Sequence, residues 1–204
     1  MAKKEITQTA PQSDKKLRTK DLIYAGAFGA IYIVLMLAIV LTTGAVPVLY
    51  VLEPLFVGIV CATVYELCVL KVHKFGAALI LGILFAAVSC SGYLVAMALA
   101  ILAALLAEFV MMAGQYKSKK MFLLSYVAFN LNMVCPFTQL YFKKDEFLSI
   151  SRNFYGAEYA AGVEKIATAW LPLLQIGLAV IGALIGIAIA SRLIEKHFAK
   201  AGIV

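Results

Sequence analysis

The stretch LIYAGAFGAIYIVLMLAIVLTT, residues 22–43, contains no charged side chain. A helix that crosses the hydrocarbon core of a bilayer needs about 20 mostly apolar residues, and it satisfies its own backbone hydrogen bonds. This stretch therefore predicts a membrane-spanning helix. Residues 1–20 before it are polar and rich in lysine, with no apolar core, which predicts a flexible cytoplasmic tail and no cleavable signal peptide.

The composition extends this prediction to nearly the whole chain. Of the 204 residues, 64% are hydrophobic and 14% are charged, whereas a soluble domain has about 25% charged residues. That imbalance excludes an ordinary water-soluble fold. The four cysteines lie inside apolar stretches without the paired spacing of a zinc site, so we expect buried thiols and no metal site.

Charges, glycines and prolines divide the apolar sequence into six predicted spans. The predicted helices cover about residues 22–43, 48–70, 75–88, 93–116, 121–142 and 166–191, and a mixed, charged segment at 143–165 precedes the last. The predicted fold is therefore all-α, a polytopic membrane domain of six transmembrane helices over residues 21–204. The third helix is short for a bilayer.

The distribution of lysine and arginine predicts the orientation. When the segments between spans are assigned to alternating sides, fourteen of the eighteen positive charges fall on one side. By the positive-inside rule that side is cytoplasmic, which predicts a multi-pass protein of the cytoplasmic membrane with both termini inside. Topology thereby accounts for the net charge of +7, and no nucleic-acid partner is expected.

Two acidic residues fall in the cytoplasmic halves of predicted helices. Glu66 lies five residues before Lys71, and Glu108 lies nine before Lys117. Charges inside a bilayer are costly, so each is a candidate functional residue by default. Two interpretations stay open: the acids pair with lysines or polar groups of neighbouring helices, or they form an ion relay.

Polar and aromatic residues also gather at one depth in the outer half. Glu53 lies beside Pro54 near the outer mouth of the second helix. Small-molecule sites are usually apolar cavities with a few polar groups, so we predict a substrate site at this depth. The residues predicted for it from their position are Glu53, Ser91, Tyr93, Asn130, Gln139, Trp170 and Gln175, with Ser89 at the same level. The alternatives are a carboxylate at the interface for Glu53, a hydrogen bond between helices for Asn130 or Asn132, and an aromatic belt for Trp170.

Small residues at four-residue spacing predict close contacts between helices. Helix one has two such pairs, Ala25 with Gly29 and Gly26 with Ala30, and the last helix has Gly182 with Gly186. The last pair predicts an internal contact, whereas the first helix could also meet a partner protein. The sequence has no Walker A loop, no H-E-x-x-H and no G-x-S-x-G, so we expect no enzyme activity and no cofactor.

Four stretches at helix ends resemble one family of membrane proteins. They are LRTKDLI (17–23), KVHKFG (71–76), YKSKK (116–120) and KHFAKAGI (196–203). They resemble the substrate-binding S components of energy-coupling factor (ECF) transporters, and most nearly the branch called Trep_Strep or MptD-like. The resemblance covers nearly the whole chain. It implies a six-helix protein that captures a vitamin-like or cofactor-like small molecule from outside, as part of an ABC-type importer.

The resemblance also implies partners and contact residues. The partners would be a transmembrane coupling subunit and two cytoplasmic ATPase subunits. In such proteins an Ala-x-x-x-Ala motif in the first helix contacts the coupling subunit, and the matching residues here are Ala25, Gly26, Gly29 and Ala30. The family's site lies under the loop that joins helices one and two, which adds Tyr50 to the site and makes the loop at 44–49 a candidate lid.

Two other functions remain open on the sequence. One is a self-sufficient secondary transporter or channel that uses Glu66 and Glu108, and the other is a membrane scaffold without a ligand. The polar set of one acid with several amides and hydroxyls suits a neutral or weakly cationic heterocycle, while apolar walls would also admit a tetrapyrrole.

Overall fold

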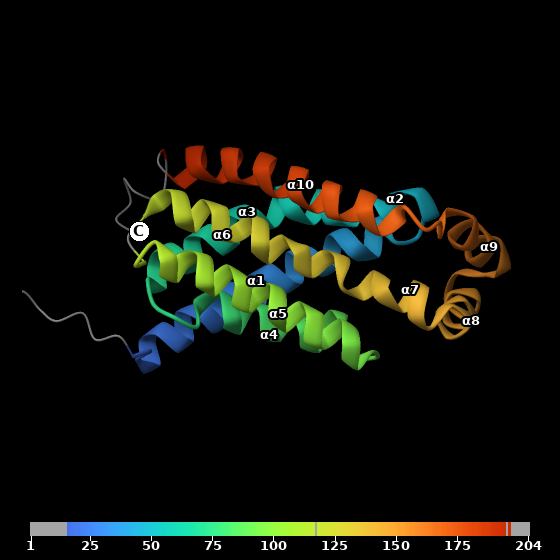
Figure 1. The fold of residues 1–204 in the computed structure, drawn as a ribbon, viewed down its shortest axis with the longest axis horizontal. Helices are drawn as coiled ribbons and strands as arrows, with labels where there is room; N and C mark the ends of the chain where they lie inside the picture. The colour runs from blue at the N-terminus through green and yellow to red at the C-terminus, as the bar shows by residue number, and fades with distance from the viewer. Residues whose placement is uncertain (1–15, 117, 195, 197–204) are drawn as a thin grey trace, which may run out of the picture.

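The fold comes from a computed structural model, which describes residues 16–116, 118–194 and 196. Residues 1–15 of the tail predicted at 1–20, together with Lys117, Glu195 and residues 197–204, lie outside the described residues. Within the described part, all regular structure is helical. In Figure 1 the long helices run side by side, and two short helices, α8 (Lys144–Tyr155) and α9 (Ala157–Ile166), lie across one end.

The opposite end carries the beginning of α1 (Thr19–Thr43) and the end of α10 (Leu171–Leu193), as Figure 1 shows. We call it the basic end, because lysines and arginines flank the helices that begin or stop there. Its described basic residues include Arg18, Lys20, Lys71, Lys74, Lys119, Lys120 and Arg192. Lys74 pairs with Asp21 at 2.6 Å, which ties the beginning of α1 to the turn before α4.

Among the described residues, five helical segments are long and apolar enough to cross a membrane. They are α1, α3 (Glu53–Val72), α5 (Leu94–Ala113), the segment Lys119–Phe142 and α10. The expected all-helical membrane fold is confirmed. The remaining predicted span, the third one at 75–88, corresponds to α4 (Ala77–Ser89), with 13 residues. At 1.5 Å per residue it rises about 20 Å, which is less than the roughly 30 Å of a hydrocarbon core.

The helix predicted at 48–70 is divided. A short helix, α2 (Pro47–Val51), ends at Val51, and only Leu52 separates it from α3, which begins at Glu53. Pro54 then sits in the first turn of α3, where a missing backbone N–H leaves no hydrogen bond unmade. The division places Glu53 at the beginning of a helix instead of within a longer one.

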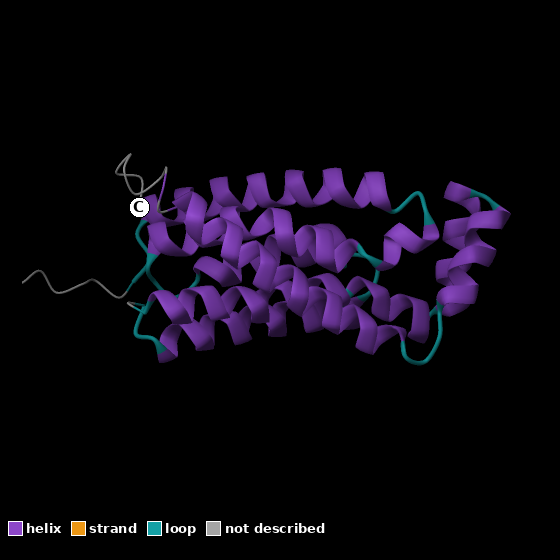
Figure 2. Cartoon of the chain, turned by 90° about the horizontal axis from the view of Figure 1, so that it is seen from above, coloured by secondary structure: helices purple, strands orange, loops and turns teal. Residues whose placement is uncertain are grey.

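The helix predicted at 121–142 is broken near its middle. It consists of α6 (Lys119–Asn130), the 3-10 turns η1 (Leu131–Val134) and η2 (Pro136–Thr138), and α7 (Gln139–Phe142). Pro136 accounts for the break, because proline cannot donate to the carbonyl one turn earlier. Figure 2, seen from above, shows the cartoon of this bundle with the α8 and α9 helices at its end.

Three other boundaries differ from those predicted. The charged segment 143–165 is mostly helical, as α8 and α9. The helix predicted at 93–116 ends at Ala113, because Gln115 and Tyr116 both have positive φ. The last span begins at Leu171 instead of 166, with Pro172 in its first turn.

The close packing of α3 against α10 depends on glycines. A Cβ atom added at Gly182 would lie 2.5 Å from the carbonyl oxygen of Leu55, and one at Gly186 would meet the carbonyl oxygen of Gly58. These backbones therefore touch directly, as small residues at helix interfaces allow. The expected internal contact of Gly182 and Gly186 is confirmed.

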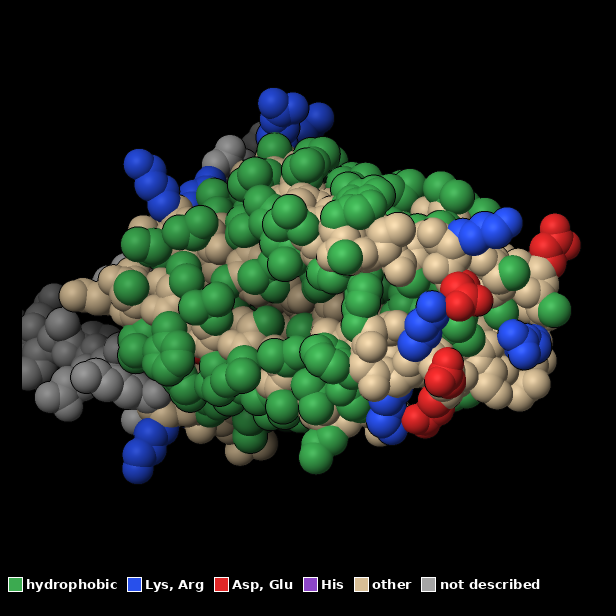
Figure 3. All heavy atoms as spheres, turned by 45° about the vertical axis from the view of Figure 1, so that its right-hand side comes forward, with side chains coloured by type: hydrophobic (Ala, Val, Ile, Leu, Met, Phe, Trp, Pro, Cys, Tyr) green, Lys and Arg blue, Asp and Glu red, His purple; other side chains and the backbone are tan. Residues whose placement is uncertain are grey.

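The outer surface of the bundle is apolar between charged ends. In the view of Figure 3, hydrophobic side chains cover the middle, and Lys, Arg, Asp and Glu gather toward the ends. In the most apolar 18-residue stretch of α1 only 22% of the residues are buried, compared with 61% in α3. Helix α3 is thus the centre of the fold, and α1 has most of its surface free for lipid or another protein.

Candidate functional site

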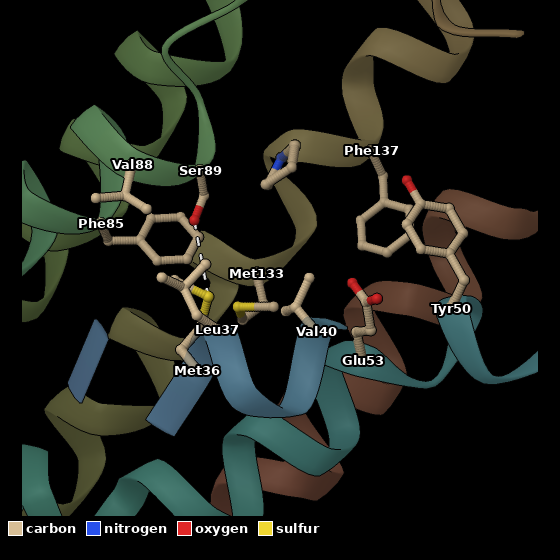
Figure 4. A pocket seen from close by; sticks show the side chains of 11 residues that line it. Met36, Leu37, Val40, Tyr50, Glu53, Phe85, Val88, Ser89, Met133 and Phe137 are labelled. Carbon is tan, nitrogen blue, oxygen red and sulfur yellow. Dashed lines mark hydrogen bonds between the residues drawn. The ribbon is translucent and has the colours of Figure 1, made fainter. Parts of the chain in front are cut away.

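A cavity of about 240 Å³ lies in the half of the bundle away from the basic end. The end of α1, the end of α4, the beginning of α3 and the broken segment η1–η2 surround it (Figure 4). Its walls are almost entirely apolar. The lining residues are Met36, Leu37, Val40, Tyr50, Glu53, Phe85, Val88, Ser89, Met133, Pro136 and Phe137.

Glu53 is the one carboxylate in this wall, and it has no strong hydrogen-bond partner there. The Thr43 hydroxyl lies 3.5 Å from Glu53 Oε1, but the same hydroxyl lies 2.8 Å from the carbonyl oxygen of Ile39. A hydroxyl has one hydrogen to donate, and the shorter contact takes it. Glu53 is only 3% exposed to solvent, and Figure 4 shows its carboxylate pointing between Val40 and the rings of Tyr50 and Phe137.

The beginning of α3 compensates only part of the cost of burying this charge. Glu53 is in the first turn of α3, where the positive end of the helix dipole stabilises a carboxylate by about 0.3–1 kcal/mol. Removing a carboxylate from water costs on the order of several kcal/mol. A positive group in the cavity would therefore stabilise the site further.

Three rings from separate elements form the wall beside Glu53. Tyr50 of α2 packs against Phe137 of η2, with ring centroids 4.6 Å apart, and against Phe147 of α8 at 6.2 Å. Burial is the main cause that raises the pKa of Tyr50 above its usual value, followed by the charge of Glu53. The phenol therefore stays protonated at physiological pH.

The loop between α1 and α2 is covered by α9. The Tyr159 hydroxyl donates a hydrogen bond of 2.6 Å to the carbonyl oxygen of Gly44. A Cβ atom at Gly162 would lie 2.9 Å from the Pro47 ring, so α9 lies directly on this loop. Burial raises the pKa of Tyr159 to about 12, and the hydroxyl keeps its hydrogen for this bond. The candidate lid at 44–49 is thus held in place by α9.

The structure brings two of the predicted site residues together in the cavity, Tyr50 and Glu53. Ser91 is exposed at the α4–α5 turn, and Tyr93 lies under the Lys143 ammonium, 5.6 Å from the ring centre. Gln139 lies near the same turn, with its Nε2 atom 3.9 Å from a Cβ placed at Gly92. Trp170 is 60% exposed. None of these four is a lining residue.

Two further predicted residues lie inside the bundle. The Asn130 amide donates to the carbonyl oxygens of Pro54 at 3.1 Å and Ala179 at 2.8 Å, which joins α6 to α3 and α10. The expected hydrogen bond between helices is therefore found at Asn130. Gln175 and Asn132 are fully buried, and their side chains have no hydrogen-bond partner among the described residues.

The cavity also contains residues that the sequence did not single out. Met36, Leu37, Val40, Phe85, Val88, Met133, Pro136 and Phe137 are such residues. Those in α1 and α4 have helical spacing as their only sequence signal, and every span of this chain shares that signal. Met133, Pro136 and Phe137 belong to the broken segment η1–η2. Ser89, noted at the same depth, does line the cavity and lies 3.8 Å from the Met36 sulfur.

Glu108 has a structural task at the basic end. Its Oε1 atom accepts backbone hydrogen bonds from Gly76 at 2.9 Å and Leu79 at 3.1 Å, and its Oε2 accepts one from the Tyr116 hydroxyl at 3.2 Å. The first N–H groups of a helix have no partner within the helix. Glu108 of α5 therefore caps the beginning of α4.

Glu66 differs from Glu108. It is fully buried in α3, and neither carboxylate oxygen has a hydrogen-bond partner among the described residues. The two acids of the predicted relay thus have different surroundings.

The two small-residue pairs of α1 face in different directions. Ala25 and Gly29 are buried, and a Cβ atom at Gly29 would lie 2.5 Å from a methyl group of Leu84 in α4. A Cβ atom at Gly26 would meet nothing within 4 Å, and Ala30 is exposed. The fold itself uses the first pair and leaves the second pair open.

The fold and the cavity define a polytopic helical membrane protein with an acidic residue buried in an apolar cavity. The family described as hypothetical bacterial integral membrane protein (Trep_Strep) matches residues 19–200. The chain belongs to this family. Comparison with curated proteins and with solved structures gives no match.

Proposed function

We propose that the chain is the substrate-capture subunit, or S component, of an ECF-type ABC importer. It binds a small molecule from outside and delivers it with a transmembrane coupling subunit and two cytoplasmic ATPase subunits. One observation carries the proposal: α1 lines the cavity with Met36, Leu37 and Val40 and leaves Gly26 open in the same helix, about 15–21 Å nearer its beginning at 1.5 Å per residue. Ligand capture and subunit contact would thus share one rigid helix.

The proposal includes a topology. The five long segments and the shorter α4 would make six crossings in the cytoplasmic membrane, with the basic end and both termini in the cytoplasm. The asymmetry of lysine and arginine supports this orientation. The cavity would then open toward the medium, and the α8–α9 pair would cover it from outside.

The volume of the cavity limits the size of the ligand. Sites for drug-sized molecules have about 300–1,000 Å³, and this cavity has about 240 Å³. A vitamin-like molecule with one or two rings suits that volume, and a tetrapyrrole does not. Within this proposal the chain catalyses no reaction and needs no cofactor, since the two ATPases supply the energy.

Co-purification with a bacterial energy-coupling module tests the role. We expect the tagged chain to retain the coupling subunit and both ATPases, and we expect uptake into vesicles only when the module and ATP are present. Full uptake by the chain alone, driven by a proton or sodium gradient, would contradict the proposal.

One observation keeps a second function in view. Glu66 is buried without a hydrogen-bond partner among the described residues, and an ionisable residue inside a membrane span is a candidate proton or ion carrier by default. A self-sufficient transporter that uses Glu66 and Glu108 would lose uptake in both Glu66→Gln and Glu108→Gln. The cap that Glu108 forms on α4 disfavours this alternative, because a relay residue would have to leave those hydrogen bonds.

A further inference from the structure

We propose that the cavity selects ligands that carry one positively charged nitrogen on a compact aromatic or apolar body. This inference rests on the proposed function only in taking the cavity as the capture site. It concerns the charge of the ligand, which neither the fold nor the family indicates.

The first argument is the charge of the wall. Among the described residues that line the cavity there is one carboxylate, that of Glu53, and there is no lysine, arginine or histidine. An anionic ligand would meet this carboxylate without any compensating positive side chain. A neutral ligand would leave the carboxylate as it is, buried and poorly bonded.

The second argument is that the two lysines at the beginning of α8 are engaged elsewhere. At the same end of the bundle, Lys143 pairs with Glu146 at 3.0 Å, and Lys144 pairs with Glu164 at 2.9 Å. The ion pairs of the described residues do not include Glu53. Among the described side chains, the Thr43 hydroxyl makes the one hydrogen-bond contact with Glu53, and it donates to the carbonyl oxygen of Ile39 at the shorter distance. The Glu53 carboxylate can therefore still accept hydrogen bonds from a charged donor.

The third argument is the aromatic wall. Tyr50 and Phe137 stand beside the Glu53 carboxylate in Figure 4, and Phe85 lies on the other side of the cavity. Faces of aromatic rings attract cations, and their bodies pack against flat apolar groups. A ligand with an ammonium or amidinium group at Glu53 and a ring between the aromatic side chains would satisfy both parts of the wall.

A matched set of probes tests the inference on the purified full-length chain. We choose 2-phenylethylamine, 2-phenylethanol and phenylacetate, which have similar size and at neutral pH are cationic, neutral and anionic. Thermal shift and isothermal calorimetry then compare their binding. We expect the amine to bind most tightly and phenylacetate to bind least. Equal binding of amine and alcohol, preference for phenylacetate, or no saturable binding of the amine would overturn the inference.

Two variants connect the effect to the proposed residue. Glu53→Gln keeps the shape of the side chain and removes its charge, so the affinity for the amine is expected to fall by about a hundredfold, as when a buried ion pair loses one partner. Unchanged binding of 2-phenylethanol would show that the cavity is intact. Glu146→Gln removes a negative charge from an exposed ion pair at the same end and should leave the affinity for the amine within about twofold, as expected for a surface pair. If both variants lose the same affinity, the charge at Glu53 is not the determinant.

The outcome separates this inference from the proposed function. Assembly with the energy-coupling module does not depend on the charge of the ligand. If the complex forms and the amine is not preferred, the charge selection fails and the capture role stands. If the amine is preferred and no complex forms, the charge selection stands and the role as a subunit of the importer fails.

Discussion

Tyr159 donates a hydrogen bond of 2.6 Å to the carbonyl oxygen of Gly44, across 115 positions of sequence. The bond joins α9, outside the bundle, to the loop between α1 and α2. That loop leads directly into Tyr50 and Glu53, so α9 is connected through the loop to the wall of the cavity.

Removing this bond should loosen the loop. In Tyr159→Phe the carbonyl of Gly44 loses its partner, and the free energy of unfolding should fall by about 1 kcal/mol. Hydrogen exchange of the backbone amides of residues 44–51 should become faster. Tyr155→Phe is the control, because Tyr155 stacks on Tyr159 at 4.6 Å and is half exposed. Equal effects of both variants would argue against the role of the bond.

The two small-residue pairs of α1 should respond differently to a large side chain. Gly26→Leu adds volume in open space, so we expect normal thermal stability and ligand binding together with loss of the coupling subunit and of transport. Gly29→Leu places its side chain against Leu84 and should lower the melting temperature. Pull-down and thermal unfolding measure the two effects. Retention of the coupling subunit by Gly26→Leu would remove this face from the proposed interface.

Contact between the α3 and α10 backbones should make Gly182 intolerant of any side chain. Gly182→Ala puts a methyl group 2.5 Å from the Leu55 carbonyl oxygen, and overpacking of this kind costs about 1–3 kcal/mol. Gly177→Ala, in the same helix with nothing within 4 Å of the new atom, should be neutral or stabilise by up to about 1 kcal/mol. Equal melting temperatures for the two variants would contradict the packing described.

The cap on α4 gives a prediction for Glu108. Glu108→Ala leaves the N–H groups of Gly76 and Leu79 without an acceptor and should destabilise the protein by about 1–3 kcal/mol. Glu108→Gln keeps an acceptor oxygen and should retain most of the stability and all of the transport. Loss of uptake in Glu108→Gln at unchanged stability would instead favour the ion-relay alternative.

The ends of helices could be predicted from the sequence wherever a single residue or a short cluster of charges interrupts an apolar run. Gly44 and the Lys71–Lys74 turn set the ends of α1 and α3 because a glycine or a cluster of charges interrupts an apolar run. Pro136 is a local signal of another kind, because it cannot donate a helical hydrogen bond at the break in the fifth predicted helix. The helices α8 and α9 were not predicted, since their charged residues outweighed the buried Leu148, Tyr159 and Val163 that hold them on the bundle.

Of the candidate site, the sequence could predict only residues of a type that is rare in membrane spans. Glu53 stands out because a carboxylate in an apolar stretch is unusual, whereas the surrounding methionines, valines and phenylalanines are ordinary for any span. Which of them face a cavity depends on how four segments pack. The bond from Gly76 to Glu108 joins residues 32 positions apart and has no local sequence signal.

The shortness of α4 has a consequence for the surrounding lipid. In the proposed topology of six crossings, a helix with 13 residues would leave a hydrophobic mismatch of about 10 Å against a typical bilayer. Headgroups and water would have to descend to Ser89, the residue where α4 ends at the cavity, and the bilayer would thin on that flank. A dissolved molecule would then find the entrance beside a dimple in the membrane surface, and thinner bilayers should hold this protein with less strain.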